Sequence, residues 1–202
     1  MLSFPVHDNW RLAVTAVNRA RRERCSMANL ILPRLYLAGY TIASDSAELV
    51  RLGVTHVVSV LEHAPSLPKS IKEECRLHVK VADRAEANLL EKLDTTTSFI
   101  RAALNENDTN VVLVHCLMGI SRSATVLCAY LIATKNMKVD QAINYVQSKR
   151  PIISPNTGFK EQLETYAKRH KQGTHSTQDS RRHDSGYSLL AKFREGIGFQ
   201  IG

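Results

Sequence analysis

The sequence predicts an α/β fold, in which one compact domain contains a central, twisted, mostly parallel sheet flanked by helices. Short apolar runs typical of buried strands alternate along the chain with longer helical patterns. One of these runs, at residues 111–114, leads through a short loop into a long apolar helical pattern that begins near Ser123. A chain of 202 residues, 44% of them apolar, is long enough to bury one substantial core.

The first half of the chain contains three predicted strand regions. A short strand pair is expected at about residues 30–38, before a helix at 46–52 that Gly53 ends. The unbroken apolar run at 55–61 predicts a buried strand, and the two prolines of 64–69 indicate a loop. Alternating apolar and polar residues predict a further strand at 76–81.

The second half of the chain is mostly helical. The remaining predicted elements are a helix at 89–105, a strand at 111–115, and helices at 122–135, 139–148 and 155–170. Ser154 is the expected N-cap of the last helix, with Pro155 in its first turn. The loop after strand 111–115 lies at the carboxyl end of a strand, where such folds bind ligands.

This loop, residues 115–123, reads His-Cys-Leu-Met-Gly-Ile-Ser-Arg-Ser. Inward-pointing N–H groups and the helix dipole would lower the pKa of Cys116 into the range of about 3.5–7.5. The planar guanidinium of Arg122 can hold two phosphoryl oxygens at once, and Gly119 permits a left-handed turn or a close backbone approach. A lone cysteine at a strand end is usually inert packing, but this combination indicates a nucleophile in an anion site.

Three neighbouring side chains could support Cys116. Ser121 and Ser123 offer hydroxyls that could bond the thiolate, and His115 could brace the loop by bonding to its backbone.

The stretch resembles His-Cys-x-x-Gly-x-x-Arg-Ser/Thr, the signature loop of the cysteine-dependent protein phosphatases, and is similar to the atypical dual-specificity branch. The resemblance includes residues 32–39, Leu-Pro-Arg-Leu-Tyr-Leu-Ala-Gly, and residues 150–159, Arg-Pro-Ile-Ile-Ser-Pro-Asn-x-Gly-Phe. It implies a protein tyrosine phosphatase-like fold and a reaction that needs no cofactor and no metal. It also implies that the substrate is bound by Leu117, Met118, Gly119, Ile120, Ser121 and Arg122.

The resemblance further implies a two-step reaction, in which Cys116 forms a phosphocysteine that water then hydrolyses. The leaving oxygen needs a proton, and Asp83, which lies 33 positions before Cys116, matches the family's general acid. Taken alone, Asp83 would be a turn residue or a helix cap, and Glu86 is the alternative acid. Ser123 would help the thiolate depart, and Asn156 would bond the signature loop unless it is only a first-turn helix residue.

The ends of the chain differ from its middle. We expect a basic N-terminal extension at 1–27, a catalytic domain at 28–170 and a polar, disordered tail at 171–202. The two ends carry most of the net charge of +8, so the domain itself is not expected to bind nucleic acid. Residues 10–24 can form an Arg-rich helix. A helix packed on the domain or a disordered extension is expected, with a mitochondrial presequence or a membrane-surface helix as the alternatives.

The cysteines and the hydropathy indicate the compartment. No apolar run of about 20 residues is present, so no membrane span is expected. The four cysteines have no framework spacing, and a nucleophilic thiolate needs a reducing compartment, which points to the cytoplasm and/or nucleus. Cys128 is expected in the core, and a weaker hypothesis is that oxidation links Cys75 to Cys116.

Phosphorylated proteins are the expected partners, with phosphotyrosine and phosphoserine or phosphothreonine as substrates. Leu117, Met118 and Ile120 occupy positions where phosphoinositide phosphatases of the superfamily usually have lysine, which argues against a lipid substrate. An RNA or nucleotide 5′-phosphatase that uses the basic ends, and a non-catalytic phospho-binding module, remain alternatives. The oligomeric state stays open.

Overall fold

The computed structural model describes residues 14–17 and 27–173, with side chains to residue 170. Residues 14–17 are helical and exposed, and the rest of the predicted helix at 10–24 lies outside the described residues, as does most of the predicted tail at 171–202. Among the described residues, no helix is both long enough and apolar enough to cross a membrane.

The core of the described fold is a five-stranded sheet with the strand order β1-β2-β5-β3-β4. The neighbouring strands β2, β5, β3 and β4 run parallel to one another, and only β1 runs antiparallel to its neighbour β2. The strands are β1 (Asn29–Leu32), β2 (Leu35–Gly39), β3 (His56–Leu61), β4 (Arg76–Lys80) and β5 (Val112–Cys116). Every residue of the central strand β5 is buried, as its unbroken apolar run requires.

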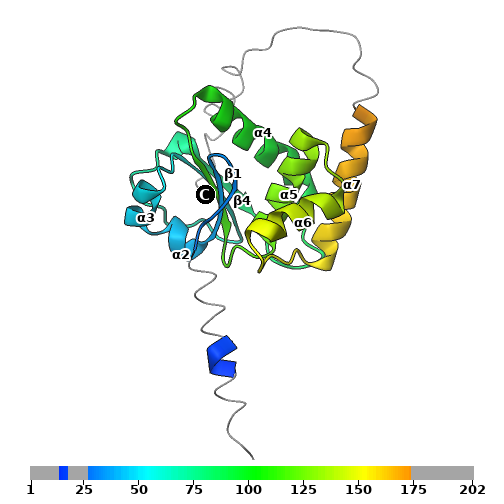
Figure 1. The fold of residues 1–202 in the computed structure, drawn as a ribbon, viewed down its shortest axis with the longest axis horizontal. Helices are drawn as coiled ribbons and strands as arrows, with labels where there is room; N and C mark the ends of the chain where they lie inside the picture. Colours follow the sequence, from blue (N-terminus) through cyan, green and yellow to red (C-terminus); the bar gives the residue numbers. More distant parts are fainter. Residues whose placement is uncertain (1–13, 18–26, 174–202) are drawn as a thin grey trace, which may run out of the picture.

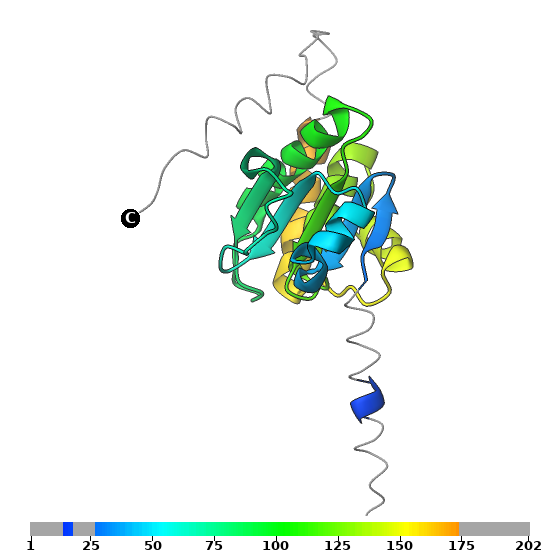
Figure 2. The ribbon, with the colours of Figure 1, turned by 90° about the vertical axis from the view of Figure 1, so that its left-hand side faces the viewer.

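Helices cover both faces of the sheet, as the alternating pattern predicts (Figure 1). The short helices α2 (Tyr40–Ala43) and α3 (Ser46–Arg51) pack on one face, where Ala38, Val57 and Leu113 form a small core. The larger core lies on the opposite face, beneath α4 (Leu90–Glu106), α5 (Arg122–Lys135), α6 (Val139–Lys149) and α7 (Thr157–Gly173). Figure 2 shows the twisted sheet between these two layers.

The predicted fold class and the order of the main elements are confirmed, and most boundaries agree within one or two residues. The sequence patterns missed α2 and the single turn of 3-10 helix at Glu73–Cys75. The predicted N-cap of the last helix was wrong. Asn156 caps α7 by accepting a hydrogen bond from the N–H of Phe159 at 2.9 Å, whereas the N–H of Ser154 bonds to the carbonyl of Ile120.

The parallel register gathers the carboxyl ends of β2, β5 and β3 at one edge of the sheet. Gly39 is paired with Cys116, and Ser59 is paired with His115. Residues that follow Gly39 and Leu61 in the chain are therefore brought next to the loop that follows Cys116.

Candidate active site

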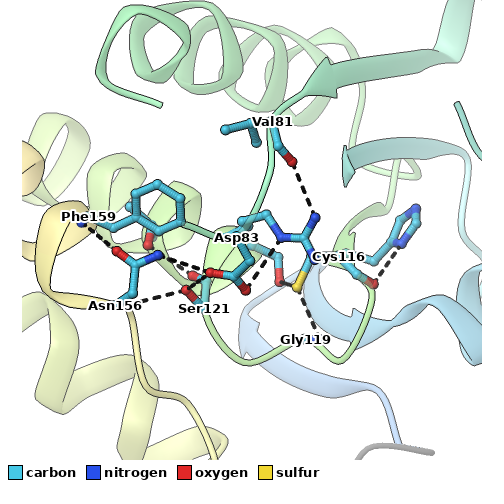
Figure 3. Close-up of polar contacts among 11 residues, drawn as sticks. Val81, Asp83, Cys116, Gly119, Ser121, Asn156 and Phe159 are labelled. Carbon is cyan, nitrogen blue, oxygen red and sulfur yellow. Dashed lines mark hydrogen bonds and ion pairs between the residues drawn. The ribbon is translucent and has the colours of Figure 1, made fainter. Parts of the chain in front are cut away.

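Cys116 ends β5 at the base of the loop and is 1% exposed. Its Sγ accepts hydrogen bonds from the Ser123 hydroxyl at 3.1 Å and from the Gly119 N–H at 3.2 Å (Figure 3). Burial by itself would raise the pKa of the thiol. The Ser123 hydroxyl, the N–H groups of Ser123 and Ile120 and the charge of Arg122 outweigh burial, so the pKa of Cys116 lies below its usual value.

The carbonyl groups of residues 117–120 are all held from outside the loop. Their donors, in order, are the Tyr40 N–H at 3.1 Å, Arg150 Nη2 at 3.1 Å, Arg150 Nε at 2.9 Å and the Ser154 N–H at 2.9 Å. Gly119 has a φ of 67°, and a Cβ there would lie 2.5 Å from the Ala38 carbonyl oxygen. These constraints turn the carbonyl groups outward, which leaves the N–H groups of the loop to face an anion.

Arg150 is a site residue to which sequence reasoning assigned no role. It is 1% exposed, and besides the two loop carbonyls it bonds the Met27 carbonyl at 2.9 Å and Asn29 Oδ1 at 2.6 Å. Arg150 begins the motif at residues 150–159 on which the family resemblance rests, so the sequence did mark this position. The contacts of Arg150 with the loop depend on the tertiary fold and could not be predicted. Arg150 therefore links the start of β1 to the back of the loop.

Arg122 is the first residue of α5 and is only 7% exposed. Its Nη1 donates to the Val81 carbonyl at 3.2 Å, and its Nε lies 3.5 Å from Asp83 Oδ2. Within the described part of the chain, the Nε–H has no hydrogen-bond partner with suitable geometry. A buried guanidinium donor without a partner is costly, so this group is suited to bind an oxyanion held by the loop.

Asp83 lies against the loop and is held there by two donors. Its Oδ1 accepts from the Ser121 hydroxyl at 2.7 Å and from Asn156 Nδ2 at 3.0 Å. The expectation that Ser121 bonds the thiolate was therefore wrong, because its hydroxyl is directed at Asp83 and only Ser123 reaches Sγ. These contacts with the loop and with Asn156 favour Asp83 over Glu86, the alternative acid.

Asn156 combines the two roles that the sequence offered as alternatives. Its side-chain oxygen caps α7, while its N–H donates to Ser121 Oγ at 3.3 Å and its side-chain amide reaches Asp83. Gly158 allows this close approach, because a Cβ there would overlap the carbonyl of Ala85. Figure 3 shows Asn156, Ser121 and Asp83 as one connected group.

His115 braces the loop from beneath, as expected. Its Nδ1 lies 3.3 Å from the Cys116 carbonyl oxygen, which can only accept, and its Nε2 lies 2.7 Å from the Ser59 hydroxyl. Burial lowers the pKa of His115 to about 4, so the ring is neutral at physiological pH. Ser59 comes from β3, and no sequence pattern indicated this contact.

The proposed link between Cys75 and Cys116 does not fit the sheet. Val57 of β3 is paired with Arg76 of β4 on one side and with Leu113 of β5 on the other. Cys75 precedes Arg76 at the start of β4, whereas Cys116 is the last residue of β5, so the two cysteines lie two strands apart and at opposite ends of the sheet. Strand geometry puts their Cα atoms about 16 Å apart, whereas a disulfide needs less than about 7 Å. Cys128 is buried in α5, where burial raises the pKa of its thiol to about 12.

An open groove of about 530 Å³ adjoins the loop. Arg122 and Asp83 belong to its lining, together with Leu117, Tyr40 and residues 61–66. Among the described residues, no group of three or more His, Cys, Asp or Glu side chains is placed to hold a metal ion.

A buried thiol of lowered pKa, a ring of N–H donors, an arginine and a carboxylate together define a cysteine-dependent phosphatase site. The model of the dual specificity phosphatase catalytic domain matches residues 35–169. The chain belongs to this family and carries its catalytic domain.

The similarity to individual proteins covers the same region. The chain is 39% identical over 144 residues to human dual specificity protein phosphatase 16, covering 71% of this chain and 21% of that protein. It is 33% identical over 138 residues to dual specificity protein phosphatase 22-B of Danio rerio, covering 68% and 73%. The human tyrosine phosphatase-like serine/threonine/tyrosine-interacting protein has a similar structure, with a TM-score of 0.65, 31% identity and coverage of 71% and 97%.

Proposed function

We propose that this protein removes phosphate from phosphotyrosine and from phosphoserine or phosphothreonine of proteins through a phosphocysteine intermediate. The observation that carries the proposal is the position of Cys116 Sγ. It lies at the base of a loop whose carbonyl groups are held outward and whose arginine has a buried Nε–H without a hydrogen-bond partner among the described residues.

In the first step, the Cys116 thiolate attacks phosphorus in line and the bond to the leaving oxygen breaks. Asp83 gives its proton to that oxygen, because an aryl or alkyl oxide leaves poorly unless it is protonated. The N–H groups of the loop and Arg122 stabilise the charge on the three equatorial oxygens.

In the second step, the ionised Asp83 takes a proton from water, whose oxygen attacks the phosphocysteine. The S–P bond breaks, inorganic phosphate leaves and the thiolate of Cys116 is restored. The Ser123 hydroxyl, 3.1 Å from Sγ, stabilises the departing thiolate. His115, Ser121 and Asn156 serve as positioning residues, because each holds the loop or Asp83 and none reaches the sulfur.

We further propose that residues 28–170 are the catalytic domain, that residues 1–27 and 171–202 are extensions of it, and that the protein works in the cytoplasm and/or nucleus. The lowered pKa of Cys116 supports the location, because such a thiolate survives in a reducing compartment.

A non-catalytic phospho-binding module is the second candidate, favoured by the structural similarity to a phosphatase-like interacting protein. Against it, Cys116, Arg122 and Asp83 are all present here, Arg122 Nε lies 3.5 Å from Asp83 Oδ2, and the charge of Arg122 helps to lower the pKa of Cys116.

The test is hydrolysis of p-nitrophenyl phosphate and of phosphotyrosine and phosphothreonine peptides by the full chain in the presence of a chelator. We expect turnover that Cys116→Ser abolishes and that Asp83→Ala and Arg122→Ala reduce strongly. Tight phosphopeptide binding without turnover would support the binding module instead. Selective cleavage of RNA 5′-phosphates would support the polyanion alternative.

A further inference from the structure

The groove beside the phosphate-binding loop continues directly from the catalytic site. Arg122 and Asp83 line the groove and also contact each other at 3.5 Å at the loop. A phosphoryl group held by the loop would direct its ester oxygen toward Asp83, so the group attached to that oxygen must enter the groove. The groove lining therefore determines which phosphorylated side chain fits best.

Tyr40 occupies a fixed position in this lining. It follows Gly39, which is paired with Cys116, so the sheet register brings it next to the loop. Its N–H donates to the Leu117 carbonyl at 3.1 Å, and its hydroxyl donates to the Ser66 carbonyl at 3.4 Å. Tyr40 thus spans the distance from the phosphate-binding loop to the segment at residues 61–66 that forms the other side of the groove.

Half of the twelve described residues that line the groove are apolar or aromatic. The apolar members of the lining are Tyr40, Leu61, Ala64, Pro65, Ala82 and Leu117. Leu117 is 56% exposed, so it adds an accessible apolar side chain to this lining. An aromatic ring could pack against this surface, whereas the single methyl group of a phosphothreonine would leave most of it in contact with water.

The charges in the lining disfavour a ligand with many phosphates. Arg122, which would hold the phosphoryl group, and Arg84 are the only Arg or Lys side chains among the described residues of the groove lining, and Glu62 is a carboxylate in the same lining. A phosphoinositide or an RNA end would bring further anions, for which the described lining offers only Arg84 beside Glu62. A single phosphate on an apolar aromatic side chain suits this mixed lining better.

We propose that the groove binds the ring of phosphotyrosine, and that Tyr40 is a specificity-determining residue through which the enzyme prefers phosphotyrosine over phosphothreonine. This inference rests on the proposed function and adds a preference within it. The preference comes from binding at the groove and requires no chemical step beyond those already described.

The test uses the full chain and two peptides of identical sequence, one with phosphotyrosine and one with phosphothreonine. We expect kcat/KM for the phosphotyrosine peptide to exceed that for the phosphothreonine peptide by about tenfold or more. Tyr40→Ala should lower this ratio about tenfold, mainly by raising KM for phosphotyrosine. Tyr40→Phe keeps the ring and should retain most of the ratio.

Tyr145→Ala is a matched control. Tyr145 is also partly buried and also donates its hydroxyl to a backbone carbonyl, that of Ile31 at 3.2 Å, but it lies on α6 and outside the groove lining. The ratio should be unchanged in this variant. Thermal unfolding of each variant checks its fold, and the ratio is independent of the fraction of active enzyme.

The outcomes separate the two proposals. Efficient turnover of both peptides with a ratio near one, or a ratio that Tyr40→Ala leaves unchanged, would overturn this inference and leave the proposed function standing. No turnover of either peptide or of p-nitrophenyl phosphate would overturn the proposed function itself.

Discussion

The side-chain amide of Asn156 donates to Asp83 Oδ1 at 3.0 Å, while the same side chain caps α7 through the Phe159 N–H at 2.9 Å. The two residues are 73 positions apart in the sequence. The loop that carries Asp83 is thus attached to the N-terminus of the last helix. This contact gives Asp83 a defined position even though its side chain is 36% exposed.

Asn156→Asp keeps a side chain that can cap α7 but removes the hydrogen bond to Asp83. Aspartate is as good an N-cap as asparagine, but it has no amide donor and would repel the Asp83 carboxylate. We expect kcat to fall about tenfold or more, with a steeper dependence on the pKa of the leaving group because protonation of that oxygen becomes inefficient. A series of aryl phosphates measures this dependence.

Asn156→Ala is the comparison variant for that experiment. It removes the contact and also the cap, so it should show the same kinetic change with an additional stability loss of about 1 kcal/mol. If Asn156→Asp has the leaving-group dependence of the wild type, Asn156 does not position the acid.

Ser123→Ala should raise the pKa of Cys116 toward the usual value for a thiol, because it removes a hydroxyl donor to Sγ at 3.1 Å. At pH 6 the variant would then hold less thiolate. We expect the midpoint of the pH profile for alkylation by iodoacetamide to move up by about one pH unit.

Ser121→Ala is the control for this shift, because the Ser121 hydroxyl donates to Asp83 and not to the sulfur. Its alkylation midpoint should remain that of the wild type. Equal midpoints in wild type and Ser123→Ala would exclude the assigned role of Ser123.

The buried His115 should make the fold sensitive to mild acid. Its pKa is about 4 in the folded protein, below the usual value of 6.5 that the unfolded chain would have. Between pH 6.5 and 4 the unfolded chain therefore binds a proton that the folded protein does not, and the free energy of unfolding falls as the pH falls. The expected loss is about 3 kcal/mol at the acid end, and this group contributes no change above pH 6.5.

Urea unfolding at pH 7 and pH 4.5 measures this effect. Burial also lowers the pKa of His56, so the comparison is made with His115→Asn, which should lose less stability between the two pH values than the wild type. Identical losses in the two proteins would contradict the assignment to His115.

Arg150→Lys should loosen the phosphate-binding loop. One ammonium group cannot replace the guanidinium bonds to the Met118 and Gly119 carbonyls at 3.1 and 2.9 Å together with the bonds to Met27 and Asn29. We expect inhibition by inorganic phosphate to weaken about tenfold, because the N–H groups of the loop lose their fixed orientation.

Arg34→Lys is the control, because Arg34 is a partly buried arginine away from the loop. Arg34 also bonds three backbone carbonyls, those of Leu104, Asn107 and Asn110, but at the end of α4. This variant should lose stability while its inhibition by phosphate stays unchanged. An unchanged inhibition constant in Arg150→Lys would mean that Arg150 has only a structural role.

The sequence allowed prediction of the parts of the site that are local in the chain. Cys116, Arg122 and Ser123 lie within one strand–loop–helix unit, where spacing alone fixes the geometry. Asp83 was predicted to be the general acid only because of the family resemblance. The contacts of Arg150, Ser59 and Tyr40 depend on strand order and helix packing, which single-sequence patterns do not specify.

The errors have similar physical causes. Ser154 and Asn156 are both good N-caps two residues apart, and the choice between them was decided by the contact of Ser154 with the loop. The link between Cys75 and Cys116 failed because spacing in sequence does not reveal which end of a strand each cysteine occupies.

The most direct measurement is a rapid acid quench of the full chain reacting with a phosphotyrosine peptide, followed by mass spectrometry of the digested protein. We expect one phosphate per chain on the peptide that contains Cys116, and none in Cys116→Ser. Release of inorganic phosphate at the wild-type rate without any phosphorylated Cys116 would contradict the proposed reaction. So would turnover by Cys116→Ser.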